Sequence, residues 1–233
     1  MKLVRAKRED EIFYGVLEGD RIDRIEGDLF DDWRRTGDWI GRPEVQLLAP
    51  VAPVNIFAIG LNYRKHASES EMDLPERPLI FLKATTAATH DGADILLPKL
   101  APDEVDYEAE LCVVIGKTAK DLEPEETPDY ILGYTCGNDV SARDCQLRLD
   151  GQWARGKSFD TFAPLGPHIE TEFDPTAARI QSRLNGQVMQ DSNLSDLIFP
   201  VKELVSYLSK NVTLLPGTVI MTGTPGGVGF ARE

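Results

Sequence analysis

The sequence has little cysteine and no long hydrophobic run. Its three cysteines, Cys112, Cys136 and Cys145, form no CxxC pair and are an odd number for a set of disulfides. No stretch approaches the roughly 20 apolar residues of a membrane helix, and the N-terminus lacks the apolar core of a signal peptide. We therefore expect a protein of the reducing cytoplasm with no membrane partner.

Positive charge is also scarce. The chain carries 25 Lys plus Arg against 39 Asp plus Glu, a formal net charge of -14. Such a chain repels phosphate backbones, so we expect no nucleic-acid partner. The glycine-rich run MTGTPGGVG has neither the GKS or GKT ending of a P-loop nor the GxGxxG order of a dinucleotide fingerprint, which argues against a nucleotide as well.

Short apolar strands make up most of what the sequence does contain. Residues 1–50 predict a small N-terminal β module, and the proline-marked residues 47–55 predict a linker to a main domain at 51–233. Asn185-Gly186 between alternating runs predicts a hairpin. One helix is expected to begin at Pro200, because an apolar stripe at helical spacing follows it. Since strands and helices do not alternate regularly, we expect a mainly β fold, a roll or sandwich with a few short helices.

Three carboxylates lie two residues apart in EVDYEAELCVVIG, at Asp106, Glu108 and Glu110. If this segment is one strand, they share a face where the strand enters the interior. Buried like charges repel and tend to protonate unless a cation compensates them. Asp139 ends a later apolar strand and could supply a further oxygen ligand. The pattern favours a hard divalent ion, Mg²⁺ or Mn²⁺ with Ca²⁺ as a substitute, although a solvated strand end is the commoner reason for an ExE pair.

Five motifs, in this order, resemble the fumarylacetoacetate hydrolase family: YEAELCVVIG, GNDVSARD, GKSFDTFAPLGP, LNGQVMQDSN and MTGTPGGVG. The resemblance runs from about residue 55 to the end and implies a mixed β-roll of that family's type. It implies that Glu108, Glu110 and Asp139 hold the metal, and it gives Asp106 no role. Family members usually continue with a further strand that closes the roll, so we expect that strand to be missing here. The resemblance also implies a homodimer.

His66 and Glu69, in GLNYRKHASESE, lie three residues apart, which on a helix places them within hydrogen-bonding reach. On its own, such a pair is more often surface decoration. The acylpyruvate-cleaving branch of the family has a similar segment, and the resemblance implies that this His and Glu activate a water.

The resemblance implies three further sets of contacts with substrate. Lys157 would face substrate oxygens, and Arg143 and Gln146 would bind substrate. Thr224 would lie near a substrate carboxylate. From the residues alone, Lys157 could equally be an exposed lysine, Arg143 a partner of Asp144, and the glycine loop around Thr224 a tight turn.

The function that the resemblance implies is a divalent-metal-dependent hydrolase or lyase. It would cleave a C–C bond in a small anionic 2-oxo acid, such as an acylpyruvate, through a metal-bound enolate. Oxaloacetate-type decarboxylation and isomerisation of 2-hydroxyhepta-2,4-diene-1,7-dioate use the same enolate and remain open. A non-catalytic, ligand-binding domain stabilised by its metal is the alternative outside enzymes.

Overall fold

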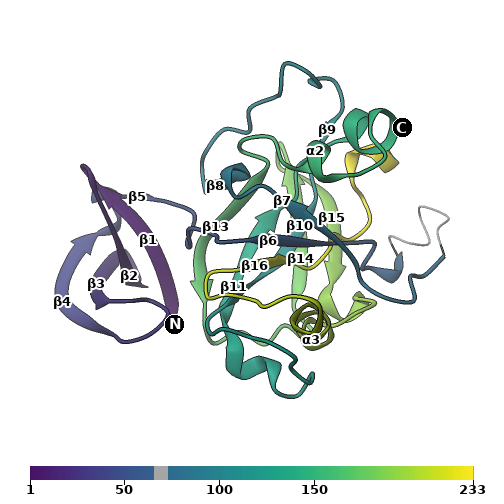
Figure 1. Cartoon of the computed structure of the whole chain (residues 1–233). Coiled ribbons are helices and arrows are strands. Elements are labelled where there is room, and N and C mark those ends of the chain that lie inside the picture. The colour runs from purple at the N-terminus through teal and green to yellow at the C-terminus, as the bar shows by residue number, and fades with distance from the viewer. Residues whose placement is uncertain (66–72, 233) are drawn as a thin grey trace.

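One mixed sheet of twelve strands runs through the computed structural model, which describes residues 1–65 and 73–232. Its strands follow the order β4-β3-β2-β1-β13-β11-β10-β16-β6-β7, with β5 beside β1 and β8 beside β13 (Figure 1). Neighbouring strands are antiparallel except in the pairs β13·β8 and β16·β6. The predicted mainly β fold with few helices is confirmed.

The strands of the large sheet are β1 (Lys2–Arg8), β2 (Glu11–Glu18), β3 (Arg21–Gly27), β4 (Trp33–Gly41), β5 (Gln46–Leu47), β6 (Ile56–Gly60), β7 (Leu79–Lys83), β8 (Ala88–His90), β10 (Ala109–Ile115), β11 (Ile131–Asn138), β13 (Ala163–Glu170) and β16 (Val219–Met221). Two small sheets pair β9 (Val105–Asp106) with β12 (Ser141–Ala142), and β14 (Arg179–Leu184) with β15 (Gln187–Asn193).

The helices are short: α2 (Ala154–Lys157), α3 (Val201–Asn211), a π-helix (Cys145–Leu149) and 3-10 helices at Arg42–Glu44, Thr85–Ala87, Thr127–Tyr130, Leu194–Asp196 and Gly229–Ala231. None of the helices in the described part of the chain has the length and hydrophobicity that crossing a membrane requires.

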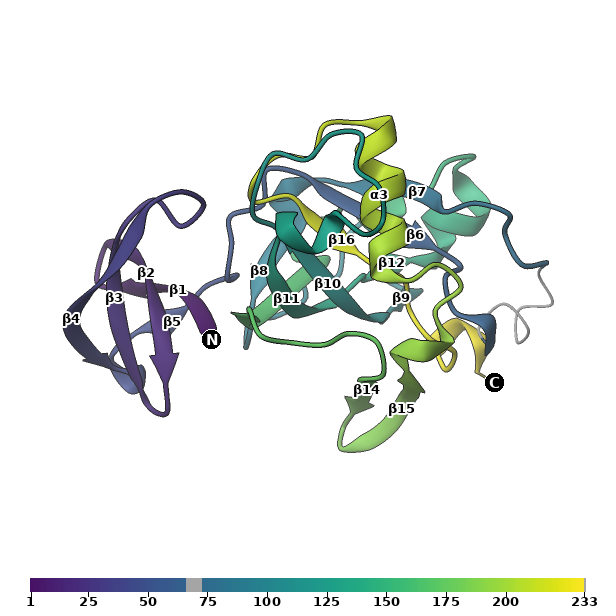
Figure 2. The same ribbon diagram turned by 90° about the horizontal axis from the view of Figure 1, so that it is seen from below.

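The N-terminal strands β1 to β5 stand to one side of the other strands and enclose a small apolar core of their own (Figure 2). They join the rest through β1, where Leu3 pairs with Ile169 of β13. The N-terminal ammonium lies 2.6 Å from Glu170 Oε1 at the same junction. The large sheet is therefore continuous across residue 50, and the predicted domain boundary there stays a prediction.

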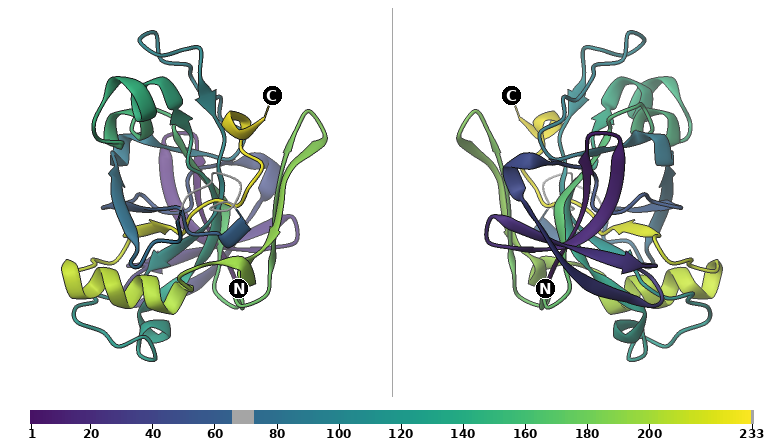
Figure 3. Two further views of the ribbon diagram at one scale, coloured as in Figure 1. Left: turned by 90° about the vertical axis from the view of Figure 1, so that its right-hand side faces the viewer. Right: turned by 90° about the vertical axis from the view of Figure 1, so that its left-hand side faces the viewer.

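Strand β10 lies inside the sheet with both faces buried. Cys112 and Val114 pack into one apolar cluster, and Val113 and Ile115 pack into a second cluster that includes α3. Figures 1 and 3 show α3 on one side of the sheet, with α2 and the C-terminal turn on the opposite side. Strand β10 thus holds the side chains of its first residues, Glu110 among them, in fixed positions.

Helix α3 and the β14–β15 hairpin confirm two local predictions. The predicted stripe of Val201, Leu204, Val205 and Leu208 is buried, although the helix begins at Val201 and Pro200 is its N-cap. The hairpin turns at Asn185 and Gly186, both with positive φ (51° and 79°), as a two-residue hairpin turn requires. The hairpin projects from the body of the molecule (Figures 2 and 3).

The acidic segment differs from its prediction, because it forms two strands rather than one. Strand β9 ends at Asp106 and pairs with β12, while β10 begins only at Ala109. Glu108 lies between the two strands, and only Glu110 belongs to the long strand. The expectation that the three acids share one face of one strand is therefore wrong for Asp106.

Candidate metal centre

Glu108, Glu110 and Asp139 come together at the start of β10. Each offers a carboxylate oxygen, and these oxygens lie within 4.8 Å of one another. Strand pairing produces this arrangement, because Ala109 is opposite Asn138, the residue before Asp139. The backbone N–H of Asp139 donates to the carbonyl of Glu108 at 2.9 Å, which extends the pairing by one step. All three residues are buried.

The cluster meets the chemical requirements of a hard divalent ion. Its donors are all carboxylate oxygens, the ligands that Mg²⁺, Mn²⁺ and Ca²⁺ prefer. Burial, together with the charges of Asp139 and Glu108, raises the pKa of Glu110 well above its usual value. Glu110 accepts a hydrogen bond from Gly223 N–H at 2.7 Å, which does not offset those effects. A cation bound here would relieve the repulsion, so the residues present fit a metal.

Lys157 is not the exposed lysine that it could have been from sequence alone. It ends α2, is 2% exposed, and its Nζ lies 2.8 Å from both Glu108 Oε2 and Asp139 Oδ2. Burial would lower the pKa of Lys157, but the charges of Asp139 and Glu108 outweigh burial and raise it. For Glu108, burial is likewise outweighed by Lys157 and Arg143, and its pKa falls to about 2.

Lys83, at the end of β7, also belongs to the site, although the sequence analysis did not predict it. Its side chain is fully buried, and its Nζ donates to Asp139 Oδ1 and, at 3.2 Å, to the carbonyl of Val140. Burial is the largest cause of its lowered pKa, and Asp139 opposes that effect. The sequence contains a signal for Lys83, because a charged residue ends the apolar run LIFLK and Asp139 likewise directly follows a strand, β11.

Arg143 pairs with Asp106 and Glu108 rather than with Asp144. Its Nε and Nη2 lie 2.9 and 2.7 Å from Asp106 Oδ2, and its Nη1 lies 2.6 Å from Glu108 Oε1. The same Nη1 donates to Gln146 Oε1 at 2.8 Å. Asp144 instead accepts from the backbone N–H of Cys145. The structure therefore places Arg143 and Gln146 beside the acidic cluster.

A pocket of about 370 Å³ opens next to the cluster. Its polar lining comes from several elements: Glu108, Arg143, Gln146, Lys157 and Thr224. Its apolar lining includes Phe81 and Trp153, whose rings meet edge to face at 5.5 Å between centroids. The predicted metal ligand Glu108 and the predicted substrate-binding side chains thus border one cavity.

The glycine loop after β16 contributes backbone to this site. Gly223 has a φ of +100°, and a Cβ there would lie 2.7 Å from Asn62 Cβ, so only glycine fits. Thr224 donates to the carbonyl of Ala109 at 2.9 Å and accepts from Gln190 Nε2 at 2.7 Å. The loop is tied to the first residue of β10 and presents Thr224 to the pocket.

The remaining two predicted catalytic residues, His66 and Glu69, lie outside the described residues. Their roles stay predictions.

Comparisons with known proteins agree with this architecture. The sequence model of the family described as fumarylacetoacetate (FAA) hydrolase C-terminal matches residues 55–233, and that of an Rv2993c-like N-terminal module matches residues 1–50. An uncharacterised protein of Archaeoglobus fulgidus is 52% identical over 189 residues, which cover 81% of this chain and 75% of that protein.

Two further relatives carry names. A mitochondrial oxaloacetate tautomerase of Bos taurus is 44% identical over 197 residues; the match covers 82% of this chain but only 62% of the bovine protein. The crystal structure of a 5-carboxymethyl-2-hydroxymuconate delta-isomerase from Mycobacterium smegmatis superposes with a TM-score of 0.91 at 43% identity, over 98% of this chain and 90% of that one. The chain belongs to the fumarylacetoacetate hydrolase family.

Proposed function

We propose that this protein is a divalent-metal-dependent enzyme that interconverts the enol and keto forms of a small 2-oxo acid such as oxaloacetate. The observation that carries the proposal is the buried cluster of Glu108, Glu110 and Asp139, of which Glu108 lines a pocket that Lys157 also lines. The names of the bovine and mycobacterial relatives, a tautomerase and an isomerase, support proton transfer as the reaction.

The reaction moves one proton between the carbon beside the 2-oxo group and the oxygen of that group. A divalent cation held by Glu108, Glu110 and Asp139 would supply positive charge that stabilises the enolate between the two forms. Lys157 would also stabilise the negative charge of the enolate, because its raised pKa keeps it an ammonium that donates hydrogen bonds. Lys157 is for that reason a poor base.

The proposed base for the carbon-bound proton is therefore His66, with Glu69 as the carboxylate that orients it. Arg143 contributes by holding Glu108 from the side away from Lys157, with its Nη1 2.6 Å from Glu108 Oε1. Phe81 and Trp153 line the pocket beside Lys157, and their apolar rings exclude water, which strengthens every charge interaction inside it.

Hydrolysis of the C–C bond in an acylpyruvate is the second candidate. It is favoured by the matching family model, which carries the name of a hydrolase. It needs the same enolate and, in addition, a water activated by His66 and Glu69. The two candidates therefore share the acidic cluster and differ in what His66 does.

The test is an assay panel of oxaloacetate and acylpyruvates with Mg²⁺ or Mn²⁺, in which tautomerisation, pyruvate release and CO₂ release are followed separately. We expect metal-dependent tautomerisation that a chelator abolishes. Lys157→Met should lower kcat by about 100-fold, since it removes a preorganised donor to developing charge. Turnover that survives the chelator, or metal-dependent melting without any turnover, would contradict the proposal.

His66→Ala separates the two candidates. If His66 only activates water, acylpyruvate cleavage is lost while tautomerisation persists, and the assignment of His66 as the base for the carbon-bound proton is wrong. If both reactions are lost together, His66 is the shared base that the proposal requires.

A further inference from the structure

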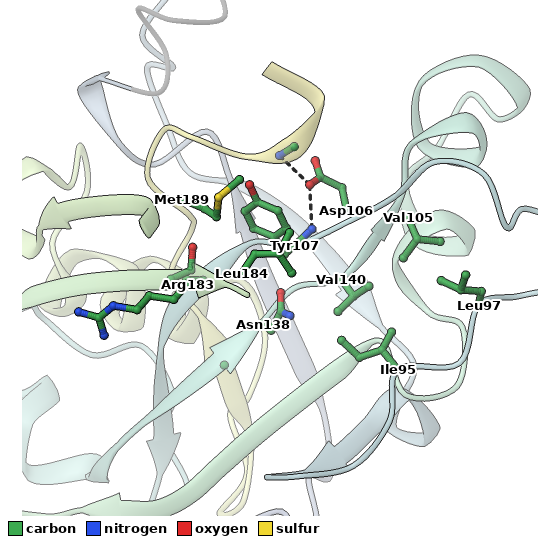
Figure 4. A pocket seen from close by; sticks show the side chains of 14 residues that line it. Ile95, Leu97, Val105, Asp106, Tyr107, Asn138, Val140, Arg183, Leu184 and Met189 are labelled. Carbon is green, nitrogen blue, oxygen red and sulfur yellow. Dashed lines mark hydrogen bonds between the residues drawn. The ribbon is translucent and has the colours of Figure 1, made fainter. Parts of the chain in front are cut away.

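Asp106 accepts five hydrogen bonds beside the metal centre, yet it is not one of the clustered acids. It is 7% exposed. Its Oδ1 accepts from the backbone N–H of Tyr107 at 2.8 Å and of Gly229 at 2.7 Å (Figure 4). Its Oδ2 accepts from Arg143 Nε and Nη2 and from the backbone N–H of Phe230 at 3.0 Å. Each of these five groups is a donor.

Asp106 fixes the orientation of the Arg143 side chain. Two of its three guanidinium nitrogens are committed to Asp106 Oδ2, at 2.9 and 2.7 Å. This fixes the plane of the guanidinium and leaves Nη1 facing Glu108 Oε1 at 2.6 Å. A planar guanidinium held at one edge orients the group at its other edge. Asp106 thereby sets the position of a proposed metal ligand that it does not touch.

Asp106 also binds the C-terminal turn. Val228, Phe230 and Ala231 line the pocket beside the metal centre. Between them, Gly229 packs so closely on Asp106 that a Cβ at Gly229 would lie 2.5 Å from Asp106 Oδ1. Two N–H groups of the turn, those of Gly229 and Phe230, donate to this buried carboxylate.

We propose that Asp106 is a positioning residue of the metal centre: it holds Arg143 against Glu108 and fastens the turn 228–231 over the substrate pocket. The inference rests on the proposed function for its metal, but not on which reaction follows. One buried carboxylate thus joins three separate parts of the chain, β9, the residue after β12, and the C-terminal turn.

Asp106→Asn is the direct test. An asparagine must turn its NH₂ group either toward the N–H groups of Tyr107 and Gly229 or toward the guanidinium and the N–H of Phe230, because all five groups that bind the carboxylate are donors. The charge that neutralises Arg143 is lost as well. We expect the affinity for Mn²⁺, measured from the electron paramagnetic resonance signal of the free ion, to fall by about 10- to 100-fold, the usual effect of losing a partner of a metal ligand.

Gly229→Ala separates the two roles of Asp106. Its methyl group would lie 2.5 Å from Asp106 Oδ1, which is not the oxygen that binds Arg143, so we expect the turn to be displaced while Oδ2 stays bound to Arg143. We expect KM for oxaloacetate to rise while the affinity for Mn²⁺ is unchanged. A loss of Mn²⁺ affinity as large as that of Asp106→Asn would contradict the assignment of the metal effect to Arg143.

Asp23→Asn is the matched control. Asp23 is also buried, accepts the N–H of Gly37 at 2.9 Å and lies 3.8 Å from Arg35 Nε, but it belongs to β3 in the N-terminal strands. It should lower the melting temperature without changing Mn²⁺ affinity. Equal losses of affinity in both variants would show a merely structural role.

Two outcomes distinguish failure of this inference from failure of the proposed function. If the unaltered protein binds no Mn²⁺, the proposed function fails first. If it binds Mn²⁺ and Asp106→Asn binds it equally well, only the role of Asp106 is wrong. Should Asp106→Asn not fold, Arg143→Lys must show the loss instead, because a lysine cannot hold both carboxylates in the same plane. Retained affinity there overturns the proposal.

Discussion

Each acid of the metal centre has different neighbours, and these decide its charge. Glu108 lies between Lys157 and Arg143, and its pKa is lowered to about 2. Glu110 has one backbone N–H as its hydrogen-bond donor, and its pKa is raised by burial and by Asp139 and Glu108. Among the described residues, Glu110 is therefore the acid of the cluster that no Lys or Arg side chain pairs with.

Glu110→Gln should separate stability from metal binding. A carboxyl whose pKa is higher in the folded protein than its usual 4.5 takes up a proton on folding. The stability of the metal-free protein therefore falls as the pH rises from about 4.5 toward the pKa of the folded protein. In chelator, the melting temperature of the unaltered protein should drop relative to that of the variant as the pH rises above about 4.5. The variant should bind no Mn²⁺. Parallel melting curves would contradict the raised pKa, and exposed Glu125→Gln is the control.

Lys83→Met should make the protein more dependent on an added cation. It removes one buried partner of Asp139, which costs about 3 kcal/mol in the metal-free protein because a buried charge loses compensation. Saturating Mn²⁺ should then raise the melting temperature of the variant by more than it raises that of the unaltered protein. Equal shifts would show that Lys83 does not compensate the cluster; exposed Lys202→Met serves as control.

Among the secondary-structure elements, the sequence predicted those that a local periodic pattern of residues encodes. The Asn-Gly hairpin and the apolar stripe of α3 are both present, since each depends on local spacing. Strand β4 was not predicted, because its residues from Arg34 to Trp39 are all exposed and so show no alternation of apolar and polar residues. It pairs antiparallel with β3, a contact that local spacing does not encode.

The break between β9 and β10 could not be predicted either. It depends on β12 pairing with β9 while β11 pairs with β10, which is a matter of tertiary contacts. The same contacts turn Asp106 toward Arg143. Motif resemblance supplied the acidic cluster, Lys157, Arg143 and Thr224, but the partners of those residues, Lys83 above all, required the structure.

Leu208→Ala tests the packing of α3. The side chain is fully buried against the second apolar cluster, so its truncation should destabilise the protein by about 2–5 kcal/mol in urea unfolding. Because α3 lies on the opposite side of the sheet from α2, Mn²⁺ affinity of the folded variant should not change. A loss below about 1 kcal/mol would mean that the helix is not anchored as described.

At the scale of the whole molecule, one sheet brings together residues that lie far apart in the sequence. Lys83 ends β7, Asp139 follows β11, and Lys157 ends α2, yet all meet within hydrogen-bonding distance. In a chain with a net charge of -14, the cations that are buried among the described residues, Lys83, Arg143 and Lys157, all lie where an anionic substrate is proposed to bind. A homodimer and a cytoplasmic location remain predictions. The bovine relative is named as a mitochondrial protein.

The most direct test of the central claim is the anomalous diffraction of a crystal soaked in manganese. The account predicts one strong manganese peak, coordinated by oxygens of Glu108, Glu110 and Asp139, with Lys157 moved away from at least one of them to admit the ion. Carboxylates that stay paired with Lys157 and Lys83, with no manganese between them at saturating concentration, would contradict it.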